Sequence, residues 1–177
     1  MMKKIQEIDN FDHVVSLEQL KRELEYKFSL ICSKPSLNKL SDSLNLIEAK
    51  KAAFNGILKL QTENKIILEG RVTAKLIQAC SLTLDPVITN ISKKVQRSFS
   101  VGSESDVSKK KNIFELTKKC FDNDVILDRI NLGDVLMETI SLETPDYPKK
   151  SGATLHLLPK AEYNRENPFS ILSKLKK

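Results

Sequence analysis

Residues 66–84 read Ile66-Ile-Leu-Glu-Gly-Arg-Val-Thr-Ala-Lys-Leu-Ile-Gln-Ala-Cys-Ser-Leu-Thr-Leu84, and this stretch decides the fold. Its even-numbered positions are mostly apolar or small, whereas most of its odd-numbered positions are charged or polar. This two-residue period predicts a half-buried β-strand, because successive side chains of a strand point to opposite faces. So long a strand has to bend to stay on one core, and we expect a kink or bulge at Gly70 or near residues 78–80.

Similar alternation flanks this strand on both sides. Residues 52–60 carry apolar or small side chains at even positions, and the polar residues 62–64 that follow are typical of a turn. Asp85-Pro86 breaks the pattern, and the alternation then resumes over residues 87–101. Three long strands joined by short turns predict an antiparallel meander, with barrel-like closure as an open alternative.

The segments around the meander predict short helices and further, shorter strands. Residues 24–32 alternate as a strand does, and Pro35 opens a segment with leucines on one helical face. Asn131 is a favoured N-cap for a helix that follows it. The residues expected to face inward from that helix are Leu132, Val135, Leu136, Thr139 and Ile140. The fold class is therefore α+β, a bent antiparallel sheet with short flanking helices and a flexible C-terminal tail.

The chain divides into one domain with tails. We expect an N-terminal extension over residues 1–10 and a single α+β domain over residues 11–143, with a mobile loop at about residues 102–112. Residues 144–166 contain several prolines among polar residues, which is typical of a linker. Residues 167–177 predict a short basic amphipathic helix.

That C-terminal helix has a complete set of local signals. Asn167 is a favoured N-cap, and Pro168 occupies a position where the first turn tolerates proline. A helix this short is marginal alone in water and needs a surface to bind. The candidates for docking to a partner are Phe169, Leu172 and Leu175. The basic residues at its end, which are candidates for RNA contact, are Lys174, Lys176 and Lys177.

Composition favours a soluble cytoplasmic protein. The chain has 177 residues, and no apolar run approaches the ~20 residues that span a bilayer. Its N-terminus lacks the apolar core of a signal peptide. The three cysteines, Cys32, Cys80 and Cys120, are far apart and in apolar settings, which predicts reduced, buried thiols. The net charge of +6 is compatible with an anionic partner such as RNA or a lipid surface, but general lysine enrichment would also produce it.

The sequence offers little for catalysis or metal binding. Neither His13 nor His156 lies in a recognisable nucleophile, metal or acid/base motif, and all five glycines are isolated. Cys80 has no second ligand at zinc spacing, and a packed thiol on the apolar face of its strand is the simpler interpretation. We therefore expect no enzyme, no metal, no cofactor and no small-molecule substrate.

Basic residues on the last long strand are better candidates for a binding function. No acidic residue occurs between Pro86 and Ser103, while Lys93, Lys94 and Arg97 lie on the strand. Such side chains could neutralise phosphates without reading sequence, which makes these three further candidates for RNA contact. The alternative is a solvated strand edge that charge protects from aggregation.

Three blocks of sequence carry a family resemblance. They are residues 70–87, then residues 130–142 with Pro145 and Tyr147-Pro148, then Asn-Pro-Phe at residues 167–169. Together they resemble the YceD family, the large ribosomal RNA subunit accumulation proteins, and in particular its alphaproteobacterial branch. The resemblance spans most of the chain, from about Phe11 to the end.

The resemblance implies a bacterial cytoplasmic, non-enzymatic factor that is needed for accumulation of 23S rRNA and for large-subunit biogenesis. Its implied partners are rRNA or a pre-50S particle and proteins of assembly or processing. Many members carry Cys-x-x-Cys where this chain has Cys80 and Thr83, so a metal or redox role does not transfer. The rival hypothesis is a protein-only adaptor, or a lipid-surface protein that uses the amphipathic C-terminal helix.

Overall fold

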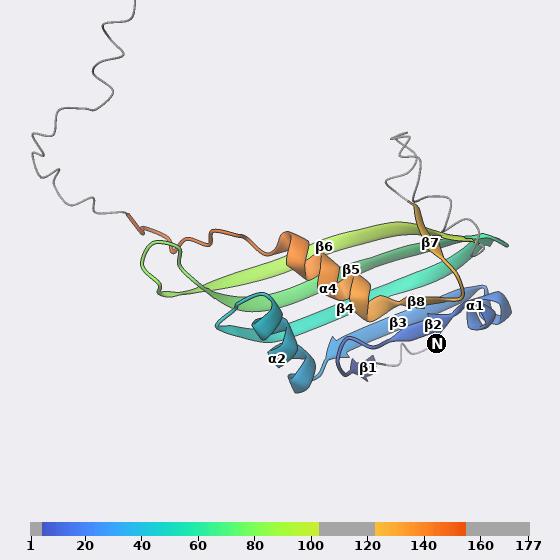
Figure 1. The fold of residues 1–177 in the computed structure, drawn as a ribbon, viewed down its shortest axis with the longest axis horizontal. Helices are drawn as coiled ribbons and strands as arrows, with labels where there is room; N and C mark the ends of the chain where they lie inside the picture. The colour runs from blue at the N-terminus through green and yellow to red at the C-terminus, as the bar shows by residue number, and fades with distance from the viewer. Residues whose placement is uncertain (1–4, 103–122, 155–177) are drawn as a thin grey trace, which may run out of the picture.

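The computed structural model describes residues 5–102 and 123–154 (Figure 1). These residues form a six-stranded sheet, a two-stranded sheet and three helices, so the predicted α+β class is confirmed. The elements in chain order are β1 (Ile5–Ile8), β2 (Val14–Ser16), α1 (Leu17–Glu23), β3 (Glu25–Cys32), α2 (Lys34–Ser43), β4 (Glu48–Thr62), β5 (Lys65–Ala79), β6 (Pro86–Val101), β7 (Asn123–Ile126), β8 (Arg129–Asn131) and α4 (Leu132–Glu143).

The large sheet has the order β1-β3-β4-β5-β6-β7. Strands β3 to β6 pair antiparallel, which confirms the meander, whereas the edge strands β1 and β7 pair in parallel with β3 and β6. The sheet is therefore mixed rather than wholly antiparallel. The alternative prediction of barrel-like closure is wrong, because β1 and β7 form the two edges of an open sheet in the described part of the chain. The predicted N-terminal extension also needs correction, since residues 5–8 belong to the sheet and Ile8 is buried in the core.

The kink expected at Gly70 is absent from β5. Pairing of β5 with β6 runs in unbroken register from Lys65↔Ser100 to Ala79↔Pro86. The register shifts occur instead in β4, between Ala49 and Lys51 and between Leu60 and Thr62. Strand β5 ends at Ala79, so the region near residues 78–80 marks the end of the strand rather than a bend within it.

Gly70 has a packing role instead. It lies directly opposite Gly56 on β4, and both glycines belong to the buried face of the sheet. A Cβ at Gly56 would lie 2.6 Å from the Glu69 carbonyl oxygen and 2.7 Å from Cζ of Phe28. A Cβ at Gly70 would lie 2.8 Å from a ring carbon of Phe54. The two glycines therefore leave space for two aromatic rings above the centre of the sheet.

The helices cover this same face. Figure 1 shows α4 crossing over the central strands, with α2 against β4 and α1 near one end of the sheet. Asn131 caps α4 as predicted, because its side-chain oxygen accepts hydrogen bonds from the backbone N–H groups of Gly133 and of His13. The predicted inward residues of α4 are all buried, namely Leu132, Val135, Leu136, Thr139 and Ile140.

The opposite side of the central strands is largely polar. Its alternate side chains on β4, β5 and β6 face away from the helices, and its charged and amide side chains are exposed. We call this surface the open face. It is defined by three rows of directly opposed residues: Lys51, Lys75 and Asn90; Ala53, Thr73 and Ser92; Asn55, Arg71 and Lys94.

Several predicted features lie outside the described residues. They include nearly all of the predicted loop at residues 102–112, the linker beyond residue 154, the C-terminal helix at residues 167–177, and Cys120. Cys32 and Cys80 are free and buried, as predicted. No helix in the described ranges combines the length and apolarity needed to cross a membrane.

The glycine pair gives a stability prediction. Gly56→Ala should lower the free energy of unfolding by about 1–3 kcal/mol, because the added methyl group meets a backbone carbonyl that cannot move aside easily. Chemical denaturation of the folded protein measures this change. Gln96→Ala, on the exposed side of β6, should change stability by no more than about 0.5 kcal/mol. Equal stability of the two variants would contradict the packing role of Gly56.

Candidate functional site

The turn between β5 and β6 holds a compact polar network. Cys80 begins this turn, and its backbone N–H donates to the carbonyl of Asp85 at 2.8 Å. The backbone N–H of Leu84 donates to the carbonyl of Cys80 at 2.9 Å, and Leu84 takes a positive φ of 62°. Pro86 then opens β6. The Asp85-Pro86 break read from the sequence therefore forms a closed turn that fixes the position of Cys80.

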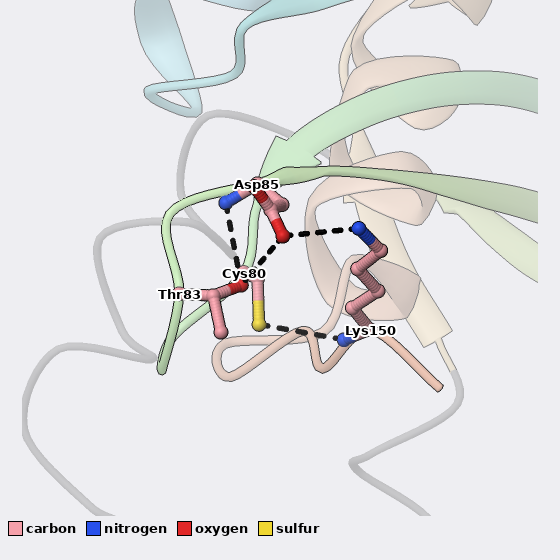
Figure 2. A network of polar contacts seen from close by, with 4 residues as sticks. All are labelled: Cys80, Thr83, Asp85 and Lys150. Carbon is pink, nitrogen blue, oxygen red and sulfur yellow. Dashed lines mark hydrogen bonds and ion pairs between the residues drawn. The ribbon is translucent and has the colours of Figure 1, made fainter. Parts of the chain in front are cut away.

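The segment after α4 returns to this turn. Gln78 Nε2 donates to the carbonyl of Pro145 at 2.9 Å, and the Ser81 N–H and hydroxyl both donate to the carbonyl of Pro148 at 2.8 and 2.7 Å. The backbone N–H of Lys150 lies 3.4 Å from Cys80 Sγ (Figure 2). Residues 145–150, which we call the strap, are thus bound to the sheet. The first residues of the predicted linker over 144–166 are thus held by the domain, because the carbonyls of Pro145 and Pro148 accept hydrogen bonds from the side chains of Gln78 and Ser81.

Hydrogen bonds hold Cys80 in a setting that favours its thiolate. The backbone N–H of Lys150, the Thr83 hydroxyl and the backbone N–H groups of Leu82 and Thr83 together lower the pKa of Cys80 to about 6. Desolvation opposes this shift only weakly, although the side chain has no exposed surface. The expectation of a thiol packed on an apolar strand face is therefore corrected, because Cys80 lies past the end of β5 among N–H and hydroxyl groups.

Asp85 and Lys150 complete the network. Lys150 Nζ lies 3.0 Å from Asp85 Oδ2, and the hydrogen bonds from Lys150 and Thr83 lower the pKa of that carboxyl. The single proton of the Thr83 hydroxyl can be given either to Asp85 Oδ2, at 3.2 Å, or to the sulfur of Cys80. Figure 2 shows the four side chains converging from the turn and the strap. The arrangement links the turn to the strap. No three metal-ligating side chains group together anywhere in residues 5–102 or 123–154.

The predicted phosphate contacts on β6 do not form one surface. Lys93 and Arg97 lie on the face that α4 covers, where Lys93 Nζ is 2.6 Å from Glu143 and an Arg97 guanidinium nitrogen is 2.7 Å from Glu138. Arg97 also lies 3.6 Å from Asp124. Its ion pair with Glu138 lowers the pKa of that carboxyl. These two basic residues therefore serve as links between β6 and its neighbours.

Lys94 lies on the other side of the strand, in the open face. It is exposed and directly opposite Arg71 of β5. Sequence reasoning missed Arg71, although its odd-numbered position on the long alternating strand already assigned it to the polar face. The pairing register of β5 with β6, which places Arg71 directly opposite Lys94, could not be predicted from the alternation alone. The other candidates, Lys174, Lys176, Lys177, Phe169, Leu172 and Leu175, lie outside the described residues, and their roles stay predictions.

Comparisons with known proteins add no relatives. Neither protein-family models nor curated proteins nor solved structures gave a match to this chain.

The network around Cys80 gives a prediction about its ionisation. Thr83→Val keeps the branched shape but removes the hydroxyl donor, so the pKa of Cys80 should rise from about 6 toward its ordinary value. The thiolate absorbance in the ultraviolet, followed against pH in a Cys120→Ser background, measures this pKa. Cys32 does not interfere, because burial raises its pKa to about 12.

The matched control is Thr73→Val on the open face, which removes the same hydroxyl far from the sulfur. It should leave the titration of Cys80 unchanged. A parent protein whose Cys80 titrates at the ordinary thiol value would contradict the hydrogen-bonded arrangement.

Proposed function

We propose that this protein is a non-enzymatic factor required for accumulation or processing of 23S rRNA, and hence for large-subunit biogenesis, in the bacterial cytoplasm. It belongs by this proposal to the YceD family, of the alphaproteobacterial type, and binds rRNA or an assembly partner on the pre-50S particle. The starting point is the resemblance carried by residues 70–87, by residues 130–142 with Pro145 and Tyr147-Pro148, and by residues 167–169.

The meeting of two of these blocks in space is the observation that carries the proposal. The first block forms most of β5, the turn and the start of β6, and the second forms β8's end, α4 and the first part of the strap. They meet where Gln78 and Ser81 donate to the carbonyls of Pro145 and Pro148. Two blocks that are far apart in the sequence thus form one junction. Such a contact gives a structural reason for both blocks to occur together in one family.

The composition of this junction supports a binding role rather than catalysis. Its contacts are mostly hydrogen bonds to backbone carbonyls, which hold the strap in place. The strap follows α4, so the junction fixes the position of the chain just before residue 155. A fixed chain position before a basic C-terminal sequence suits a factor that bridges rRNA and a protein partner.

Depletion of the protein in its own host tests the proposal. The expected result is a fall in mature 23S rRNA, a rise in its precursors, and a smaller large-subunit peak on a sucrose gradient, while 16S rRNA is less affected. Northern analysis and gradient profiles measure these quantities. Normal 23S rRNA and a normal large-subunit peak after depletion would refute it.

A complementing copy that lacks residues 167–177 separates rRNA function from protein docking. Loss of co-purified assembly proteins with the domain still folded is the result expected from the predicted docking stripe. Unchanged recovery of partners would remove that role from Phe169, Leu172 and Leu175.

A further inference from the structure

The open face carries two pairs of like charges in direct opposition. Lys51 of β4 lies directly across from Lys75 of β5, and Arg71 of β5 lies directly across from Lys94 of β6. All four side chains are exposed. Like charges placed directly opposite each other on neighbouring strands destabilise a sheet. Because this unfavourable pairing occurs twice, a negatively charged partner bound at this surface would relieve the repulsion.

The fold supplies no such partner within the described residues. None of the four side chains forms an ion pair there, and Arg71 makes a hydrogen bond to the uncharged Ser92 hydroxyl at 3.2 Å. Basic residues elsewhere do find carboxylates. The pairs are Lys59 with Glu69, Lys93 with Glu143, Arg97 with Glu138 and Lys150 with Asp85. Lys51, Arg71, Lys75 and Lys94 therefore have no acidic partner among the described residues, although the Lys59–Glu69 pair lies on the same side of the sheet.

Small side chains separate the two charged pairs. The middle row of the open face consists of the small residues Ala53, Thr73 and Ser92. The two charged rows are four residues apart, which is about 14 Å along the strands, and the three strands together span about 10 Å. Serine, threonine and asparagine side chains join lysine and arginine in most contacts to phosphate and sugar. The surface thus offers charge and hydrogen bonds to an extended polyanion.

The chemistry of this face favours a nucleic acid backbone over other anionic partners. The aromatic residues of the long strands, Phe28, Phe54 and Phe99, belong to the covered face, so the open face gives bases nothing to stack on. Between its cations lie asparagine, serine, threonine and one alanine, whereas the large apolar side chains on this side of the sheet, such as the directly opposed Ile77 and Ile88, flank the three rows. Contacts would therefore be to phosphate and ribose and would not depend on sequence.

We propose that the open face binds the sugar–phosphate backbone of RNA through Lys51, Arg71, Lys75 and Lys94. This inference rests on the proposed function and names the surface by which the factor holds rRNA. Lys93 and Arg97 have no part in it, because they remain bound to acidic residues beside them.

RNA binding by the full chain tests the surface directly. The probe is a single-stranded RNA of uniform sequence, titrated at several salt concentrations. The variant Lys51→Gln, Arg71→Gln, Lys75→Gln, Lys94→Gln should bind about tenfold or more weakly. Its plot of log affinity against log salt should be shallower by about 3, since each phosphate contact to a single strand contributes ~0.7.

The chain offers a matched control on the helices. The control variant is Lys21→Gln, Arg22→Gln, Lys34→Gln, Lys39→Gln. It also removes three lysines and one arginine, and all four are exposed and have no ion-pair partner among the described residues. This control should bind RNA nearly as the parent does. Equal weakening by both variants would mean that only net charge matters, and would overturn the proposal. Loss of binding to anionic vesicles in place of RNA would overturn it in favour of a lipid surface.

Stability measurements distinguish loss of an RNA contact from unfolding of the variant. Removing opposed like charges should leave the denaturation midpoint of the open-face variant unchanged or raised. If the fourfold variant unfolds, Arg71→Gln and Lys94→Gln alone should each make the salt plot shallower by ~0.7. Single variants with the parent's salt dependence would overturn the proposal.

Complementation of the depleted strain separates this inference from the proposed function. Rescue of 23S rRNA by the parent and the helix control but not by the open-face variant supports both. Full rescue by the open-face variant would overturn the inference and leave the proposed function standing. Normal 23S rRNA after depletion would overturn the proposed function, while the binding measurements would still decide whether this face holds RNA.

Discussion

The directly opposed glycines Gly56 and Gly70 are the constraint on which the covered face depends. Their lack of side chains lets the rings of Phe28 and Phe54 lie over the centre of the sheet, where they meet edge to face with centroids 4.9 Å apart. The aliphatic residues of α4 pack over the same face. In a chain without tryptophan, these two rings are among the largest fully buried side chains.

Burial of one face leaves the other to polar residues. Because side chains alternate along each strand, the residues between the buried ones on β4, β5 and β6 all emerge together on the open face. The same alternation separates Lys94 from Lys93 and Arg97, although they are neighbours in sequence. The acidic residues of α4 neutralise the two basic residues on their own side, and the four cations of the open face stay without carboxylates in the described structure.

Local patterns in the sequence predicted the parts that depend on neighbours along the chain. The alternation of apolar and polar residues predicted the long strands and the turns between them, and Asn131 predicted the start of α4. The parallel edges, the strap and the partners of Lys93 and Arg97 escaped prediction, because each depends on residues brought together from far along the chain. Cys80 shows the difference: its alternation suggested an apolar face, but the donor N–H of Lys150 comes from seventy residues later.

The central claim is that one face of the sheet packs and the other binds RNA. Methyl NMR of the full chain, with and without a short single-stranded RNA, tests it most directly. We expect the methyl resonance of Thr73 on the open face to shift on addition of RNA, while those of the buried Leu68 and Val95 stay in place. Shifts that are absent from the open face, or that gather on residues beneath α4, would contradict the account.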